Sequence, residues 1–143
     1  MTARRTLDDL LAEARGRIDR VEPAAAWAAA QDGACIVDVR SQPARLVPGS
    51  LLIPRTVLEW RLDPASAWRS PHAPGLGERV LLLCDHGESS SLAAATLVEL
   101  GFSRAGDIVG GFAAWVEAGL PVVDAPPAAE GLAGMAPRVT PGE

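Results

Sequence analysis

The hydrophobic positions near the start of the chain follow a helical pattern. They are Leu7, Leu10, Leu11, Ala14 and Ile18. This spacing predicts a helix in residues 1–17, packed on the rest of the molecule. Residues 18–21 then predict a short first strand. Pro23 and Gly33 bracket an alanine-rich stretch, residues 24–30, which predicts a second helix.

Two apolar runs, of which only the first contains a charged residue, Asp38, indicate strands that are buried on both faces. Residues 35–39 form the first run and residues 80–83 the second. Continuous runs of this length are typical of the inner strands of a parallel sheet. Residues 51–53 and 107–109 are shorter runs next to proline or glycine, and they predict further strands.

Segments of helical composition separate these strands. Residues 56–62 predict a short helix or turn, and residues 63–77, which are rich in proline and glycine, predict a loop. Residues 89–100 predict a helix, with Ser89 or Ser90 as its N-cap. Residues 112–118 predict the last helix. The packed face expected for residues 89–100 comprises Leu92, Ala95, Thr96 and Leu100.

Strands that alternate with helices predict an α/β fold, with an open, mostly parallel sheet flanked by helices on both faces. The strand order does not follow from the pattern. The chain has 143 residues, which suits one hydrophobic core. We expect that core in residues 18–123. The proline- and glycine-rich stretch at residues 124–143 predicts a disordered tail.

Composition narrows the possible functions. The net charge is −5 and all 13 cationic residues are arginine, which argues against nucleic acid as a partner. The lack of lysine excludes Schiff-base chemistry and Walker-type phosphate loops. Two cysteines and two histidines leave little for a disulfide framework or a metal site. No run approaches the roughly 20 apolar residues of a membrane span. We therefore expect no membrane partner and a cytoplasmic location with reduced thiols.

Three predicted strands end in residues that could meet at one edge of the sheet. They lead into Asp38 with Arg40, into Cys84, and into the Gly110-Gly111 pair. Ligands of open parallel sheets bind beyond the carboxyl ends of the strands. The sequence therefore predicts a site at this edge.

The segment that follows Cys84 is the sharpest chemical feature. A strand, a short loop with a glycine and a helix start form a cradle of backbone N–H groups that favours an anion. A cysteine at its base is expected to ionise readily and act as a nucleophile. The other interpretation is that Cys84 only ends a buried strand. The cradle comprises Asp85, His86, Gly87, Glu88, Ser89 and Ser90.

The chain resembles the single-domain rhodanese family of sulfurtransferases over roughly residues 18–123. Four motifs occur in the family's order: IVDVR at 36–40, VPGS with LIP at 47–54, the loop at 84–90, and DIVGGFAAW with GLPV at 107–122. Each motif alone is weak, and four in register are specific. Residues 55–64 further resemble an actinobacterial-type subgroup.

The resemblance implies a mechanism. Cys84 would take the outer sulfur of thiosulfate or a related small anionic donor as a persulfide, held by the loop amides. Cyanide, a thiol or a protein acceptor would then remove the sulfur. No metal or organic cofactor is implied. Many relatives have an arginine at the position of Ser89, so we expect Arg61, in preference to Arg55, to supply a cation for substrate binding.

Two other functions remain open at this point. The chain could be a catalytically weak rhodanese module that carries sulfur for, or docks onto, a partner protein. A thiol phosphatase or arsenate reductase is less favoured, because the loop lacks the arginine that clamps a tetrahedral oxyanion.

The remaining polar and aromatic residues have simpler interpretations. We expect His86 to face outward and Cys35 to be inert. Asp38 and Arg40 should hold neighbouring loops by hydrogen bonds and ion pairing. Trp27 and Trp115 are expected in the core. Trp60 and Trp68 suit either core or rim, and His72 is expected in solvent.

Overall fold

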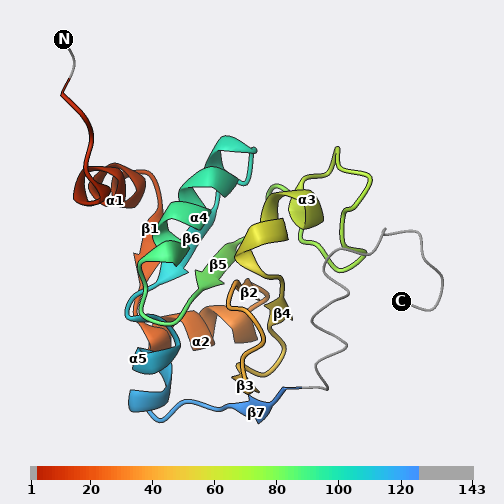
Figure 1. Ribbon diagram of the computed structural model, residues 1–143. Helices are drawn as coiled ribbons and strands as arrows, with labels where there is room; N and C mark the ends of the chain where they lie inside the picture. The colour runs from red at the N-terminus through yellow and green to blue at the C-terminus, as the bar shows by residue number, and fades with distance from the viewer. Residues whose placement is uncertain (1–2, 126–143) are drawn as a thin grey trace.

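The computed structural model describes residues 3–125, in which helices cover both faces of a five-stranded sheet (Figure 1). Along the chain the elements are α1 (Leu7–Gly16), β1 (Asp19–Val21), α2 (Pro23–Gln31), β2 (Cys35–Asp38), β3 (Arg45–Leu46), β4 (Leu51–Leu52), the 3-10 helix η1 (Arg55–Val57), α3 (Leu58–Leu62), β5 (Val80–Leu83), α4 (Ser89–Glu99), β6 (Ala105–Ile108), α5 (Gly111–Glu117) and β7 (Val123–Asp124). None of the helices in these residues is both long and apolar enough to cross a membrane.

The main sheet has the strand order β1-β6-β5-β2-β4, and every adjacent pair is parallel. This confirms the predicted α/β class and supplies the strand order. β5 is the central strand, and all four of its residues are buried. Its register places Leu83 opposite Asp38 of β2 and Leu82 opposite Asp107 of β6. The carboxyl ends of these three strands therefore lie at one edge of the sheet.

Successive residues of β5 point to opposite faces, because side chains alternate along a strand. Leu82 packs in the cluster that includes Leu58 of α3 and Leu97 of α4. Leu81 packs in the other cluster, which includes Trp115 of α5. Figure 1 shows α1, α3 and α4 above the sheet and α2 and α5 below it. The sheet is thus covered on both sides, as the continuous apolar runs require.

The tryptophans divide between core and surface. Trp115 is completely buried, meets Trp27 edge-on with ring centroids 5.8 Å apart, and donates its indole N–H to the carbonyl of Pro121 at 2.8 Å. Trp60 and Trp68 are 55% and 40% exposed, so they lie on the surface. The core interpretation of this second pair is therefore wrong, and their place at the rim of the site stays a prediction.

The predicted helix α1 forms, but only part of its apolar stripe is buried. Leu11 and Ala14 pack inward, whereas Leu7 and Leu10 are 61% and 42% exposed. The helix packs mainly on α4, so a narrow stripe is enough to attach it. Its start is fixed by the side chain of Thr6, which accepts the backbone N–H of Asp9 in a capping box.

The expected packed face of α4 was correct only in part, and its expected N-cap was wrong. Ala95 is buried as expected, but Leu92, Thr96 and Leu100 are half-buried, whereas Ala93, Ala94 and Leu97 are fully buried. This helix lies between the sheet and α1, so it is covered on more than the single predicted face. Its N-cap is Glu88, without a side-chain cap hydrogen bond, and not a serine.

The sequence pattern also missed an antiparallel pair and one strand boundary. β3 pairs with β7, and Asp124, expected in the tail, lies opposite Arg45 in this pairing. The other predicted tail residues beyond Ala125 lie outside the described part of the chain. β6 begins at Ala105 and not at the predicted residue 107. Gly106 made the start of this strand hard to predict, because glycine adds no apolar side chain to the pattern. The position requires glycine, since a Cβ there would overlap the carbonyl of Asp19.

Candidate active site

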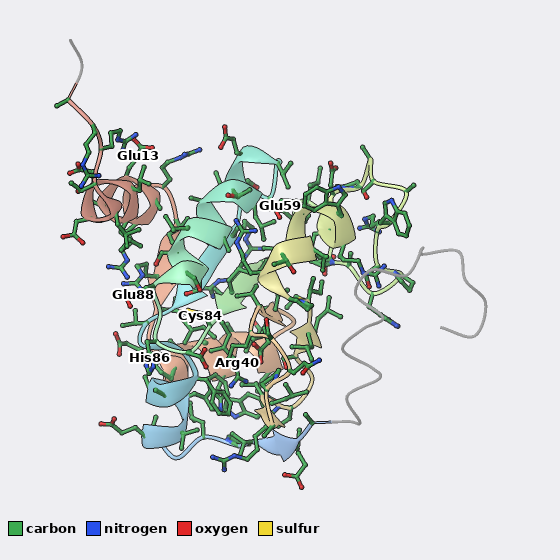
Figure 2. All side chains as sticks on the ribbon, in the orientation of Figure 1. Glu13, Arg40, Glu59, Cys84, His86 and Glu88 are labelled. Atoms are coloured by element: carbon green, nitrogen blue, oxygen red, sulfur yellow. The ribbon has the colours of Figure 1, made fainter. Side chains whose placement is uncertain are left out.

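Cys84 follows the central strand and lies where the sequence predicts the site. Figure 2 shows it at the tip of β5, with His86 and Glu88 farther out, toward the left edge of the view. The backbone N–H of Phe112 donates to the carbonyl of Cys84 at 2.8 Å, which joins the start of α5 to the loop. The predicted convergence of the Asp38, Cys84 and Gly110-Gly111 strand ends is therefore confirmed.

The loop after Cys84 curls its amides around the sulfur. The N–H groups of Gly87 and Ser90 donate to Cys84 Sγ at 3.1 and 3.3 Å. The amides of Asp85, His86, Glu88 and Ser89 donate to no group within residues 3–125. Cys84 itself is 5% exposed. The loop thus surrounds a nearly buried thiol with two engaged and four unengaged N–H donors.

The carbonyls of the same loop are turned away from this space. Those of Cys84 and Asp85 accept the N–H groups of Phe112 and Ala113, at 2.8 and 3.1 Å, at the start of α5. The carbonyl of Gly87 accepts guanidinium donors from Arg15 and Arg20. A trans peptide is planar, so each N–H points opposite to the carbonyl of the residue before it. The three anchored carbonyls therefore turn the amides of Asp85, His86 and Glu88 away from α5 and from the two arginines.

The residues of the loop differ in their exposure to solvent. Asp85, His86, Glu88 and Ser89 are exposed, whereas Gly87 and Ser90 are buried. The acidic groups thus lie in solvent, where their repulsion of an anion in the cradle is screened. The exposure of His86 agrees with the outward orientation that we expect.

Hydrogen bonding favours the thiolate of Cys84. Burial acts to raise the pKa of this thiol, but donors from Ser90, Ser89 and Gly87 outweigh it, and the pKa lies below its ordinary 9.0. The Ser90 hydroxyl donates its hydrogen to Asp107 at 2.8 Å, so the backbone N–H groups of Gly87 and Ser90 remain as donors that lower this pKa. Burial raises the pKa of Cys35 to about 11. Only one of the two thiols is poised to react.

Alkylation should distinguish the two cysteines. The thiolate is the reacting form, so the rate at Cys84 should reach half its maximum below pH 9.0, and that at Cys35 only near pH 11. Near pH 8, only about one thousandth of Cys35 is ionised. Iodoacetamide labelling followed by peptide mass spectrometry measures both rates in one sample. Equal rates at the two sites would contradict the assignment of Cys84 as the reactive thiol.

A buried carboxylate supports the loop from behind. Asp107 of β6 is completely buried and accepts the hydroxyls of Ser90 and Ser91, each at 2.8 Å. Arg20 completes the group by donating Nε to Asp107 Oδ1 at 2.8 Å. Sequence reasoning missed Asp107, Arg20 and Arg15. The sequence feature that could have indicated them is Asp107 itself, an aspartate in an otherwise small and apolar strand. A buried carboxylate requires hydrogen-bonding or charged partners.

Asp38 and Arg40 form a second buried ion pair at the same edge. Arg40 Nη2 lies 2.7 Å from Asp38 Oδ2, and their side chains are 8% and 0% exposed. The same Nη2 donates to the carbonyl of Arg45 at 2.9 Å, and the guanidinium lies 3.9 Å from the ring centroid of Phe112. The predicted holding of neighbouring loops by this pair is confirmed.

The two arginines expected near the entrance have other partners. Arg55 pairs with Glu59 at 2.9 Å, so its charge is already matched. Arg61 of α3 donates Nη1 to the carbonyl of Trp68 at 2.8 Å. The expected part of Arg61 in substrate binding stays a prediction.

Gly87 has a conformation and a position that exclude a side chain. Its φ is +86°, and a Cβ there would lie 2.6 Å from the backbone nitrogen of Gly110. Gly49 provides a matched control, because its φ is +78° but nothing lies within 4 Å of the Cβ position. Gly49→Ala should cost about 1–2 kcal/mol, the strain of the left-handed backbone alone. Gly87→Ala should cost clearly more and disturb the loop. Urea unfolding measures both, and equal costs would contradict the close packing of the loop on Gly110.

Away from Cys84, the described residues offer a surface cavity but no cluster of metal-ligating side chains. No group of three or more His, Cys, Asp or Glu side chains there gathers as metal ligands would. A surface cavity of about 230 Å³ lies near the amino ends of β2 and β5, at the edge of the sheet away from Cys84. Its lining comprises Ala29, Asp32, Gly33, Ala34, Gly77, Glu78, Arg79 and Arg104.

Comparison with known proteins points to one family. The model of the rhodanese-like domain matches residues 22–118. The thiosulfate sulfurtransferase GlpE of Pseudomonas fluorescens strain SBW25 is 35% identical over 96 residues, which are 67% of this chain and 83% of that protein. The GlpE of Pseudomonas syringae pv. syringae strain B728a is 38% identical over the same length, 85% of that protein.

Solved structures give the same fold. A protein of unknown function from Rhodopseudomonas palustris, described as a possible tyrosine phosphatase, is 32% identical with a TM-score of 0.72. The match covers 86% of this chain and 98% of that one. A polysulfide-sulfur transferase homodimer from Wolinella succinogenes is 24% identical with a TM-score of 0.63, over 80% of this chain and 85% of that one. This second likeness concerns the fold alone.

Proposed function

Because the chain belongs to the rhodanese-like family, we propose that it is a sulfurtransferase that carries sulfane sulfur on Cys84. The observation that supports this most is the arrangement of the loop around Sγ. Two amides donate to the sulfur at 3.1 and 3.3 Å, and the four other amides of the loop have no acceptor within residues 3–125. Such a cradle stabilises a negatively charged sulfur without any cationic side chain.

In the first step, the Cys84 thiolate attacks the outer sulfur of a donor such as thiosulfate. A bond forms between Sγ and that sulfur, and the sulfur–sulfur bond of thiosulfate breaks. The electron pair of the broken bond leaves with sulfite, so the products are a Cys84 persulfide anion and sulfite. The amides of Asp85, His86, Gly87, Glu88, Ser89 and Ser90 stabilise the negative charge on the transferred sulfur.

In the second step, an acceptor attacks the outer sulfur of the persulfide. Cyanide takes it as thiocyanate, and the electron pair of the sulfur–sulfur bond returns to Cys84 as thiolate. A thiol or a protein cysteine is the corresponding acceptor in the cell. Arg61 is proposed to attract the anionic end of the donor. The steps use no metal or organic cofactor, and we place them in the cytoplasm, where free thiols persist.

A phosphatase is the second candidate, because of the description given to the Rhodopseudomonas palustris protein. Tetrahedral oxyanions are normally clamped by an arginine within the loop. Here the loop has none, and the nearby Arg15 and Arg20 donate to the Gly87 carbonyl. A catalytically weak module that carries sulfur for a partner protein is the third candidate.

A parallel assay separates the three candidates. Thiosulfate, glutathione persulfide and mercaptopyruvate would each be offered with cyanide, and thiocyanate measured. We expect Cys84-dependent thiocyanate from at least one of these three donors. Cys84-dependent hydrolysis of an aryl phosphate, without thiocyanate, would overturn the proposal in favour of a phosphatase. A Cys84 persulfide that forms but releases no sulfur to small acceptors would favour the carrier.

A further inference from the structure

Two arginines that precede the matched domain converge on one atom of the active-site loop. Arg15 of α1 and Arg20 of β1 donate Nη2 to the carbonyl oxygen of Gly87, at 2.9 and 2.8 Å. The hydroxyl oxygen of Ser91, whose hydrogen is donated to Asp107, lies 3.3 Å from the same carbonyl oxygen. The family model begins at residue 22, so neither arginine belongs to the part of the chain that it describes.

We propose that Arg15 and Arg20 are positioning residues for sulfur transfer, which hold the Gly87–Glu88 peptide with its N–H facing the sulfur on Cys84. The proposal rests on the sulfurtransferase function proposed above. Neither arginine touches the sulfur. Each acts on it through the orientation of one peptide group.

The geometry of that peptide explains why it needs to be held. The carbonyl of Gly87 and the N–H of Glu88 point in opposite directions across one planar unit. A rotation of this unit would bring the carbonyl oxygen toward the thiolate and turn the unengaged Glu88 N–H away from it. Gly87 has no Cβ to resist such a rotation, and its φ of +86° lies in a region open to glycine. Two charged donors on the carbonyl favour the productive orientation.

The two arginines are not equivalent. Arg20 also pairs with the buried Asp107, with Nε and Oδ1 2.8 Å apart, so part of its effect is structural. Arg15 takes part in no ion pair among the described residues and donates Nε to Ser91 Oγ at 3.0 Å. Its charge therefore acts mainly on the loop. Arg15 is the better residue to test, because its loss does not leave a buried carboxylate unpaired.

The arrangement also gives α1 a part in the site. The helix packs on α4 through Leu11 and Ala14. Leu11 lies one helical turn before Arg15, and Ala14 directly precedes it. The guanidinium of Arg15 reaches from this attachment to the loop that precedes α4. The same packing that fixes the helix thus fixes the donor.

The test compares Arg15→Gln and Arg15→Lys with Arg17→Gln as the control. Arg17 is close by in sequence but makes only a surface ion pair with Glu99, at 3.8 Å. Arg15→Gln should raise the pH at which Cys84 alkylation is half-maximal and lower kcat for sulfur transfer about tenfold. Arg15→Lys should restore part of both, because it keeps the charge and one donor. Arg17→Gln should change neither.

Two outcomes would overturn the proposal. The first is an Arg15→Gln protein that unfolds at lower urea but keeps the wild-type alkylation profile and kcat, which indicates a purely structural role. The second is an equal effect of Arg17→Gln. Alkylation requires no sulfur donor, so it still tests the positioning if the wild-type protein fails to transfer sulfur. In that case the proposed function is contradicted, and the alkylation profile of Arg15→Gln alone decides whether Arg15 positions the loop.

Discussion

Replacing Cys84 by serine should reduce sulfur transfer at least about a thousandfold. A serine hydroxyl does not ionise near neutral pH, and it cannot hold the transferred sulfur as a persulfide. Cys84 has the lowered thiol pKa and lies inside the loop whose amides bind its sulfur. Thiocyanate formation from a sulfane donor and cyanide measures the loss.

Cys35→Ser is the matched control for this experiment. Cys35 begins β2, far from the carboxyl end of that strand, and its thiol pKa is raised to about 11. It should therefore keep the activity of the wild-type protein. Loss of activity in Cys35→Ser, with retention in Cys84→Ser, would show that the other thiol does the chemistry.

The largest effect on stability is expected from Asp38→Ala. This change leaves the guanidinium of Arg40, which is 8% exposed, without its carboxylate partner. Removing one member of a buried ion pair typically costs about 3–5 kcal/mol, because the remaining charge stays out of water. Urea unfolding followed by tryptophan fluorescence measures the change in the free energy of unfolding.

Glu59→Ala provides the control for Asp38→Ala. It also breaks an arginine–carboxylate pair, with Arg55, but those side chains are 36% and 28% exposed. An exposed helical pair contributes about 0.3–0.5 kcal/mol. If Asp38→Ala cost no more than Glu59→Ala, the pair at the sheet edge would not be holding the loops together.

The inner strands were predictable because their residues alone require burial. β5 is a continuous apolar run and β2 is apolar up to its last residue, Asp38, and a parallel sheet is the usual place for such strands. β3 and β7 were not predictable, since each has only two residues and neither shows a periodic pattern. The packed face of α4 was misjudged because alanines on all sides conceal which side meets the sheet and which meets α1.

The active-site loop was predictable from local sequence, but its support was not. A strand, a cysteine, a glycine and a helix start fall within a few residues, so the cradle follows from local geometry. Arg15 and Arg20 lie 72 and 67 residues from the glycine that they bind. No pattern along the chain connects residues at that separation. Only the parallel pairing of β1 with β6, and the packing of α1 on α4, bring them together.

The Cys84 loop contains no arginine or lysine, but two arginines from other elements donate to it. Ser89, at the position where the family resemblance leads us to expect an arginine, is exposed. Arg15 and Arg20 instead donate to the carbonyl of Gly87 in this loop. Cationic charge thus acts on the proposed site through a peptide group, not by direct contact with the donor.

Intact mass spectrometry of the protein after incubation with a sulfane donor tests the central claim most directly. The wild-type protein should gain the mass of one sulfur atom, and a reductant should remove it. Cys35→Ser should gain the same mass, and Cys84→Ser should gain none. An unchanged wild-type mass with thiosulfate, glutathione persulfide and mercaptopyruvate alike, or an added sulfur that persists in Cys84→Ser, would contradict a persulfide on Cys84.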